Sequence, residues 1–432
     1  MIENAVGILL LFGITIALGY IGSLIFRKTK IPDIVWLMLF GLVVSSFGLM
    51  DRALFLSASP LLAALALLII LFDAGLNMDF YQMIHGFSRS FILAILGFVF
   101  SMVATALMSM WLLQFDLLHG LLLGAILGGT SSAIVITIAG MLHDGYKTKT
   151  LVSLESIITD PLCIAVAIAL INVIVPSTNT YSPIHGILSS FSIGAVLGLI
   201  VGVIWLRLLD KLQGKPFDYM LTLAVVFLLY AGAEFSGGSG AIAALLFGLV
   251  LGNGKTFSKI LKMSKEYNVN PLLKTFQSEI SFFIRSFFFV YLGLIVVISP
   301  QYILYGLAIA AALIVARLIA VRVSTIGMHL SRNEKNIMTG MAPRGLAAAV
   351  LAQLPITYGI PGAEVFSSII FVVIFATVIY TSIAVKLFYK EGYEKEKPAK
   401  TSKKMEKEVK KLAEEESEFR ALNKTKRRKK RR

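Results

Sequence analysis

The heptapeptide ESIITDP, from Glu155 to Pro161, places two carboxylates inside an apolar run that extends from Leu151 to Val175. Such a run is long enough to cross a lipid bilayer as a helix. An ionised carboxylate near the bilayer centre costs at least a few kcal/mol, so acidic residues are rare there and line a pathway or pair with a buried cation. Glu155 and Asp160 are therefore the first candidates for functional or charge-pairing residues.

The whole chain has the composition of a polytopic membrane protein. Its 432 residues are 57% hydrophobic and 15% charged, with a mean hydropathy of +0.82. A helix needs roughly 17 to 25 apolar residues to cross a hydrocarbon core of about 30 Å, and the sequence contains about thirteen such stretches. They begin near Ala5, Ile34, Leu61, Phe91, Leu117, Leu151, Ile187, Met220, Ala241, Ser281, Tyr302, Ile337 and Phe366. The predicted fold class is all-α, a polytopic membrane protein of about thirteen transmembrane helices.

Basic residues predict how these spans are oriented. Lys and Arg recur in the connections that follow every odd-numbered span, for example at Lys147 and Lys149, whereas the other connections carry almost none apart from Arg52. Because cytoplasmic loops are enriched in Lys and Arg, the N-terminus is expected outside and the C-terminus in the cytoplasm. The expected location is the cell membrane.

The composition changes at about Tyr389, where apolar spans give way to a tail rich in Lys and Glu that ends in KRRKKRR. We expect a transmembrane domain over residues 1–388 and a charged cytoplasmic tail over residues 389–432. A basic block can bind nucleic acid, but beside a membrane the expected partner is the anionic lipid surface. A solvated tail that only aids membrane topology is the alternative.

The sequence lacks the usual signatures of metal, cofactor and membrane-enzyme sites. Cys163 is the single cysteine, and the five His are scattered without the Cys/His spacing of a zinc site. A nucleophile paired with a base, as in Ser-His or H-E-x-x-H arrangements, is also missing. We therefore expect no cofactor and no enzymatic activity.

Helix geometry divides the polar residues of the ESIITDP span between two faces. At about 100° per residue, Ser156 and Asp160 share one face, while Glu155 and Thr159 share a neighbouring one. The two carboxylates therefore cannot point the same way. Pro161 lacks an amide hydrogen and disfavours helical geometry at the residue before it, so we expect a local disruption beside Asp160.

Two other spans are interrupted near their middle. Residues Gly128 to Ser132 break the fifth apolar stretch, and Pro343, Arg344 and Gly345 break the twelfth. Irregular backbone at this depth persists only where protein or a water-filled cavity satisfies its polar groups. Interrupted spans in corresponding positions are typical of transporters with inverted repeats. We expect two inverted six-helix repeats around a linker span, with crossing broken helices at spans 5 and 12.

Four motifs occur together in this chain and carry a family resemblance. They are LLIILFDAGLNMD (Leu67–Asp79), ESIITDP, FFFVYLGL (Phe287–Leu294) and APRG (Ala342–Gly345). The ordered set resembles the monovalent cation:proton antiporter superfamily, the sodium/proton exchangers. The resemblance covers roughly residues 1–388 and leaves only the tail outside.

This resemblance implies roles for individual residues. Asp160 matches the carboxylate that alternately binds cation and proton, and Glu155 matches a residue that forms a structural ion pair with Arg344 of the broken helix. Asp73 matches the acidic residue of the first motif. The expected ion-binding residues are Asp160, Thr159, Ser156, Thr130, Ser131 and Asp73, with Na⁺ itself at Asp160, Ser156 and Thr130.

At two places the chain departs from the family pattern. Electroneutral members usually have Asn, and electrogenic members Asp, where this chain has Thr159. Many exchangers have Thr-Asp-Pro where it has Thr130-Ser131-Ser132, which removes a carboxylate from the first break. The choice of cation and the stoichiometry therefore stay open.

Two further arginines, Arg285 and Arg317, lie within predicted spans. Neither has an acidic residue at helical spacing in its own span. A cation at membrane depth needs a partner, so a cross-helix structural pair and a gating role both remain open for each.

The function we predict is a secondary antiporter that exchanges H⁺ for a monovalent cation, with Na⁺ or Li⁺ favoured, in an electroneutral exchange. A bare carboxylate at Asp160 is costly to carry through a dry barrier, whereas its protonated or cation-bound form is neutral. A K⁺/H⁺ exchanger of the same superfamily is the nearest alternative, and a same-architecture organic-anion symporter is a weaker one. The expected partners are the monovalent cation and H⁺, anionic lipid headgroups, and a second copy of the chain in a homodimer; no nucleic acid is expected.

Overall fold

The computed structural model describes residues 2–29, 31–48, 52–78, 87–141, 146–175, 183–212, 217–260 and 271–395. Every regular element in these ranges is a helix, which confirms the predicted all-α fold class. The chain divides into two compact units, residues 1–385 and 386–432, and the boundary falls within the last helix. Residues 396–432, most of the predicted cytoplasmic tail, lie outside the described residues.

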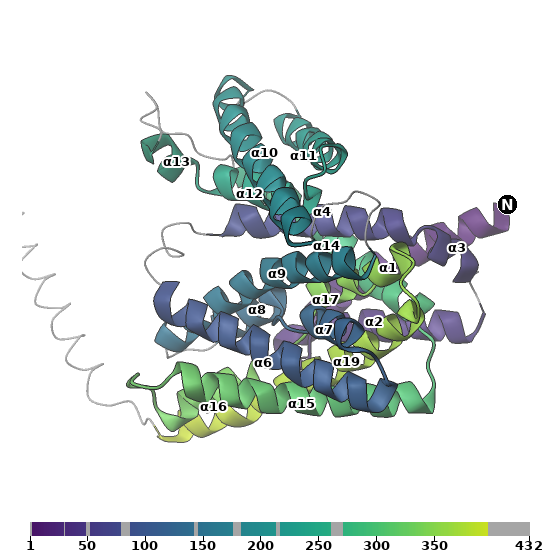
Figure 1. Ribbon diagram of the computed structural model, residues 1–432, viewed down its shortest axis with the longest axis vertical. Helices are drawn as coiled ribbons and strands as arrows, with labels where there is room; N and C mark the ends of the chain where they lie inside the picture. The colour runs from purple at the N-terminus through teal and green to yellow at the C-terminus, as the bar shows by residue number, and fades with distance from the viewer. Residues whose placement is uncertain are drawn as a thin grey trace, which may run out of the picture. The chain divides into compact units, whose positions relative to one another are not determined.

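The helices are labelled in chain order in Figure 1. They are α1 (Ile2–Thr29), α2 (Asp33–Ser46), α3 (Arg52–Ser57), α4 (Ser59–Asn77), α6 (Phe87–Leu113), α7 (Leu117–Ile126), α8 (Ser132–Met141), α9 (Tyr146–Ile174), α10 (Pro183–Leu212), α11 (Asp218–Phe235), α12 (Gly240–Gly252), α13 (Gly254–Ile260), α14 (Pro271–Ile295), α15 (Pro300–Ser324), α16 (Arg332–Gly340), α17 (Leu346–Leu351), α18 (Leu354–Thr357) and α19 (Ala363–Lys395).

Most predicted spans are single long apolar helices. Within the described ranges, eight helices are long and apolar enough to cross a membrane: α1, α4, α6, α9, α10, α14, α15 and α19. The pair α12 and α13, bent by 85°, adds one more if the two form a single span. The other predicted stretches coincide with shorter apolar helices, namely α2, α7, α11 and α17 with α18.

Both predicted helix breaks are present. The first lies between Ile126, which ends α7, and Ser132, which begins α8. The second lies between Gly340, which ends α16, and Leu346, which begins α17. Glycine and proline favour these interruptions because they disfavour a continuous helix. In contrast, α9 continues through Pro161, so the disruption expected there does not end that helix.

Helix contacts within residues 1–385 define two bundles (Figure 1). The α4 bundle comprises α1, α2, α4, α10, α11, α12 and α14, which pack mainly on one another. The α9 bundle comprises α6 to α9 and α15 to α17. The last helix, α19, joins the α9 bundle, because Val372 packs against Gly306 of α15 and Phe366 stacks on Phe115 beside α7.

Packing in these bundles follows the two predicted repeats. Under the predicted division, α2 is equivalent to α12, α4 to α14, and α6 to α15. The structure packs α2 on α14 and, in the equivalent way, α4 on α12. The equivalent helices α6 and α15 pack on each other. Exchanging the repeats therefore maps these contacts onto one another, as inverted repeats require.

Glycines permit the close approach at both equivalent crossings. An added Cβ at Gly41 of α2 would lie 3.1 Å from the Cα of Gly293 on α14, and one at Gly293 would lie 2.8 Å from the nitrogen of Leu42. Where α4 crosses α12, a Cβ at Gly75 would lie 2.8 Å from the nitrogen of Leu249. Small residues at these positions let the helix backbones touch, which is a main source of helix association in a membrane.

Gly248→Ala should weaken the crossing of α4 and α12. The added methyl group would meet the carbonyl oxygen of Phe72 and lie 3.1 Å from the nitrogen of Leu76, and these backbone atoms move only if the helices separate. Overpacking of this kind costs about 1–3 kcal/mol. Thermal unfolding in detergent measures the loss. Gly232→Ala on α11 is the matched control, because no atom lies within 4 Å of its added Cβ; equal melting temperatures for the two variants would contradict the packing role.

Candidate functional site

The two helix breaks lie against each other. The amide of Ser131, between α7 and α8, donates to the carbonyl of Pro343, between α16 and α17, at 2.8 Å. Nη1 of Arg344 donates to the carbonyl of Gly129 at 2.5 Å. A Cβ on Gly345 would collide with the Ser131 side chain, so this approach requires glycine. Each break thus satisfies part of the other's backbone, as membrane depth demands, and the predicted crossing is confirmed.

Two threonines of α19 complete the second break. The amide of Ala342 donates to the Thr381 hydroxyl at 3.3 Å, and the amide of Arg344 donates to the Thr377 hydroxyl at 3.1 Å. Both threonines are fully buried. Side-chain oxygens therefore replace the carbonyl acceptors that an unbroken helix would provide.

A cavity of about 180 Å³ lies where the α4 bundle meets the α9 bundle. Apolar side chains make up most of its lining, and a small set of polar side chains converges on it. Such a composition is typical of ligand sites. The polar residues are Asp73 and Asn77 of α4, Ser281 and Arg285 of α14, and Ser131, Ser132 and Asp160 of the α9 bundle.

Asp160 is the carboxylate that the α9 bundle presents to this cavity. It lies on the same face of α9 as Ile157 and Ile164, which also line the cavity. The hydroxyl of Ser132, the first residue of α8, donates to Asp160 Oδ2 at 2.5 Å. The start of the second half of a broken helix therefore lies directly beside the predicted ion carrier.

Asp73 contributes a second carboxylate from the other bundle. Nδ2 of Asn77, one turn along α4, donates to Asp73 Oδ1 at 3.1 Å. On α14, Arg285 acts on this carboxylate through its charge, and Ser281 lines the same cavity. The cavity therefore combines carboxylates from two bundles, which favours a cation as its ligand.

Of the remaining predicted ligands, Ser131 lines the cavity, and the other three are not part of its lining. Ser156 is fully buried and donates to the carbonyl of Ser153 at 2.9 Å. Thr159 accepts a hydrogen bond from the amide of Thr130 at 3.2 Å, which ties the first break to α9. The Thr130 hydroxyl is buried and has no hydrogen-bond partner within the described part of the chain.

Glu155 pairs with Arg317 of α15, not with Arg344 as predicted. Both carboxylate oxygens accept from the guanidinium, with 2.8 Å between Nη2 and Oε2, and both side chains are only 2% exposed. Nε of Arg317 also donates to the carbonyl of Met338 at 3.1 Å. Helices α9 and α15 both pack on α6, which brings the side chains of Glu155 and Arg317 together. Of the two alternatives left open for Arg317, the structure shows the cross-helix pair.

Arg344 is held by uncharged oxygens instead. Besides the Gly129 carbonyl, its guanidinium contacts the hydroxyl of Ser101 on α6, with 3.0 Å between Nη2 and the oxygen. Its Nε is buried without a hydrogen-bond partner among the residues that the structure describes. In those residues it also forms no ion pair, and the facing position in the first break is Ser131 rather than an acidic residue.

Arg285 also forms a cross-helix ion pair. Its Nη2 lies 3.4 Å from Oδ2 of Asp33, the first residue of α2. These two residues are 252 positions apart. No local pattern in the sequence connects them, which is why sequence analysis did not identify Asp33.

The sequence analysis did not predict three other polar residues of the cavity, namely Asn77, Ser281 and Ser132, as site residues. Asn77 lies four residues after Asp73, and Ser281 lies four residues before Arg285. This spacing puts each polar residue on the same helix face as a charged one and was a usable signal. Ser132 had a weaker signal, because a serine beside a helix break can equally bond its own backbone.

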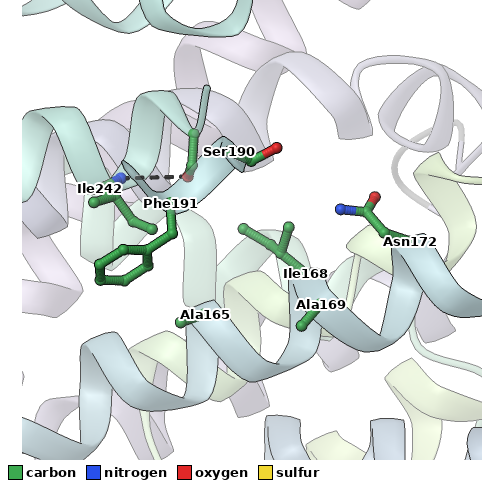
Figure 2. Close-up of a pocket in the computed structure, with 8 residues that line it drawn as sticks. Ala165, Ile168, Ala169, Asn172, Ser190, Phe191 and Ile242 are labelled. Carbon is green, nitrogen blue, oxygen red and sulfur yellow. Dashed lines mark hydrogen bonds between the residues drawn. The ribbon is translucent and has the colours of Figure 1, made fainter. Parts of the chain in front are cut away.

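A second cavity, of about 40 Å³, lies among α9, α10 and the start of α12 (Figure 2). Ile168 of α9 and Phe191 of α10 both line it. Its polar lining residues are Asn172, Ser190 and Ser239, and the Ser239 hydroxyl already accepts from the Ile242 amide. Because this lining carries no carboxylate, the candidate cation site is the larger cavity.

Curated relatives of the chain are proton antiporters by name. Over 383 residues it is 28% identical to the K(+)/H(+) antiporter NhaP of Alkalimonas amylolytica, and the match covers 86% of this chain and 64% of that protein. Over 352 residues it is 26% identical to the probable Na(+)/H(+) antiporter 2 of Methanocaldococcus jannaschii, with 78% and 82% covered. The chain therefore spans slightly less than two thirds of the Alkalimonas protein.

A solved structure with a similar fold and a matching family pattern agree with the names of these relatives. The structure of the sodium proton antiporter MjNhaP1 from Methanocaldococcus jannaschii at pH 8 matches with a TM-score of 0.75 at 23% identity, covering 90% of this chain and 98% of that one. At this identity the likeness establishes the fold. The family pattern of the sodium/hydrogen exchanger transmembrane region matches residues 13–390, which include both helix breaks and the cavity. The chain therefore belongs to the sodium/hydrogen exchanger family.

Proposed function

We propose that this protein is a secondary antiporter that exchanges H⁺ for a monovalent cation at Asp160. One observation carries the proposal: the Asp160 carboxylate lies on the wall of a cavity between two bundles, and Asp73 lines that cavity from the other bundle. Family membership and the names of the relatives, which are antiporters of H⁺ with K⁺ or Na⁺, support it.

The cost of burying charge couples the two ions. An ionised Asp160 is expensive to move through a dry barrier, whereas the protonated or cation-bound carboxylate is neutral. Only the loaded forms cross, and both ions compete for the same carboxylate. Each crossing with a cation is therefore balanced by a return with a proton.

Oxygen atoms around Asp160 supply the proposed cation site. Asp73 and Ser131 line the same cavity. The unpartnered Thr130 hydroxyl lies in the adjacent break, which Thr159 fastens to α9. Ser156 belongs to the proposed site through its place one turn before Asp160. Hard cations prefer such carboxylate, hydroxyl and carbonyl oxygens.

Na⁺ or Li⁺ is the proposed cation, and K⁺ is the alternative. The Methanocaldococcus relative is named for Na⁺, and the Alkalimonas relative is named for K⁺. Ser131 stands where a carboxylate would add a charged ligand, which keeps K⁺ as a specific candidate. Addition of Na⁺, Li⁺ and K⁺ in turn to proteoliposomes that hold a pH-sensitive dye distinguishes them.

The proposed orientation places the N-terminus outside and the C-terminus in the cytoplasm of the cell membrane, following the basic connections. Asn77 ends α4 on the basic side, so the cavity is proposed to receive its cation from the cytoplasm. Residues 389–432 are proposed as a cytoplasmic tail that meets anionic headgroups through its basic block. The proposed assembly is a homodimer.

Asp160→Asn should reduce exchange to background without unfolding the protein. Asn keeps the shape of Asp but neither takes up a proton nor neutralises a cation. Dye dequenching in proteoliposomes measures exchange, and the melting temperature in detergent checks folding. Glu279→Gln, which removes an exposed carboxylate of α14, is the matched control. Substantial exchange by a folded Asp160→Asn variant would end the assignment.

Glu155 and Arg317 should behave as a structural ion pair. Glu155→Gln and Arg317→Gln each leave an uncompensated buried charge, which costs about 3–5 kcal/mol. The double variant should regain part of that loss, whereas Glu155→Gln with Arg344→Gln should regain less, because these two side chains form no ion pair in the described residues. Thermal unfolding in detergent measures these four variants and the single variant Arg344→Gln. Additive losses for Glu155 and Arg317 would contradict the pair.

Exchange should be electroneutral, one proton for one cation. Glu155 is neutralised by Arg317 and Ser131 brings no carboxylate, so Asp160 is the main exchanging group of the α9 bundle. In proteoliposomes with an imposed membrane potential, the rate and the equilibrium position should not depend on its sign. A cation-dependent current on a supported membrane would overturn this stoichiometry and indicate Asp73 as a second proton carrier.

A further inference from the structure

The guanidinium of Arg285 places a fixed positive charge in the wall of the proposed cation cavity. Its side chain lines the cavity from α14 and is 26% exposed. Its ion-pair partner, Asp33 of α2, is 14% exposed and is not part of the cavity lining. Oδ1 of Asp33 accepts from the amide of Ile34, which fixes the carboxylate at the start of α2. Arg285 is thus fastened on one side and faces the transport site on the other.

The guanidinium of Arg285 retains unused bonding capacity. Its contact with Asp33, at 3.4 Å, is longer than the roughly 2.7–2.9 Å of a charge-assisted hydrogen bond. Its Nε is buried and has no hydrogen-bond partner within the described ranges. The Cζ atom lies 5.7 Å from the centre of the Phe282 ring, which adds a weak attraction. A better acceptor within reach would compete with Asp33 for this group.

Asp73 is that competing acceptor. Arg285 and Asp73 line one cavity, and the Arg285 charge acts on the Asp73 carboxylate. They form no ion pair in the described structure, where Arg285 pairs with Asp33. The packing of α14 on α4 is also fixed nearby, since Nε2 of Gln277 donates to the carbonyl of Ile69 at 3.1 Å. The helices that carry Asp73 and Arg285 are therefore held together beside the cavity that both side chains line.

We propose that Asp33 tethers Arg285 and thereby keeps Asp73 free to bind the transported cation. Arg285 is then a built-in competitor of the cation for Asp73, and Asp33 sets how strongly it competes. Both are positioning residues that tune cation affinity at the proposed transport site, and the inference rests on that proposed function.

The surroundings of Asp73 leave few other charges to consider. Asp160 faces the cavity from α9 and already accepts from Ser132. The sequences of α12, α17 and α18, which pack on α4, contain no charged residue. Helices α3 and α11, which also contact α4, contain Arg52, Asp218 and Glu234, and Glu234 lies outside the cavity lining. On α14, Glu279 is exposed and lies outside the cavity lining. Asp33 and Asp73 are thus the two carboxylates that compete for an ion pair with Arg285.

Steady-state exchange kinetics in proteoliposomes test the tether. Asp33→Asn should raise the KM for the cation about ten-fold or more, because the released guanidinium occupies Asp73, and should change Vmax less than about two-fold. Arg285→Gln should lower KM, because it removes a like charge from the cavity. The double variant Asp33→Asn with Arg285→Gln should have a KM at or below that of the unmodified protein.

Controls separate this effect from loss of structure. Asp33→Glu keeps the carboxylate and should retain most of the affinity, and Glu279→Gln should leave KM unchanged. An unchanged KM in Asp33→Asn, or a raised KM that persists in the double variant, overturns the tether. If Asp33→Asn does not fold, a KM in Arg285→Gln that fails to fall overturns it. Absence of exchange by the unmodified protein contradicts the proposed function instead.

Discussion

The hydrogen bond from the Ser131 amide to the Pro343 carbonyl joins two helix breaks that could not exist separately inside a membrane. The hydrocarbon interior offers no water to an unpaired amide or carbonyl, so each break needs acceptors and donors from the protein. In the first break, the Gly129 carbonyl accepts a hydrogen bond from the Arg344 guanidinium. In the second break, two backbone amides donate to threonine hydroxyls of α19. This mutual support positions Ser132, the first residue of α8, beside Asp160.

Charges at membrane depth are sorted by what they contact. Glu155 and Arg317 neutralise each other inside the α9 bundle, which fastens α9 to α15 away from the cavity. Arg344 donates hydrogen bonds to two uncharged oxygens, the Gly129 carbonyl and the Ser101 hydroxyl. Asp160 is left facing the cavity with a serine hydroxyl as its bonded neighbour. The groups that stabilise the bundle are therefore separate from the carboxylate that we propose binds the ion, and the proposed exchange does not break a buried pair.

Local patterns in the sequence predicted the helices, both breaks and the divergence of the two carboxylates, because each follows from residues close together in the chain. Glycine and proline marked the breaks, and the helical period separated Glu155 from Asp160. Pairings across helices were beyond such patterns. Glu155 and Arg317 are 162 positions apart, and the sequence offered two arginines within predicted spans that lack a local partner and a third in the broken helix. The choice among them depends on how α9, α15 and α6 pack, which is a property of the whole fold.

Carboxylates from two bundles give the cation and the proton different requirements. In the proposed exchange, a proton needs one oxygen of Asp160, whereas a cation needs several oxygens and would gain from Asp73 across the cavity. Under the proposed function, Asn77, which bonds Asp73, and Arg285, which lines the same cavity, would therefore act on the cation rather than on the proton at Asp160. Selectivity and affinity for the cation can thus change on the wall formed by α4 and α14, with the exchanging carboxylate and its crossover unchanged. In this proposal, the residues that tune cation affinity and the carboxylate that exchanges the two ions belong to different bundles.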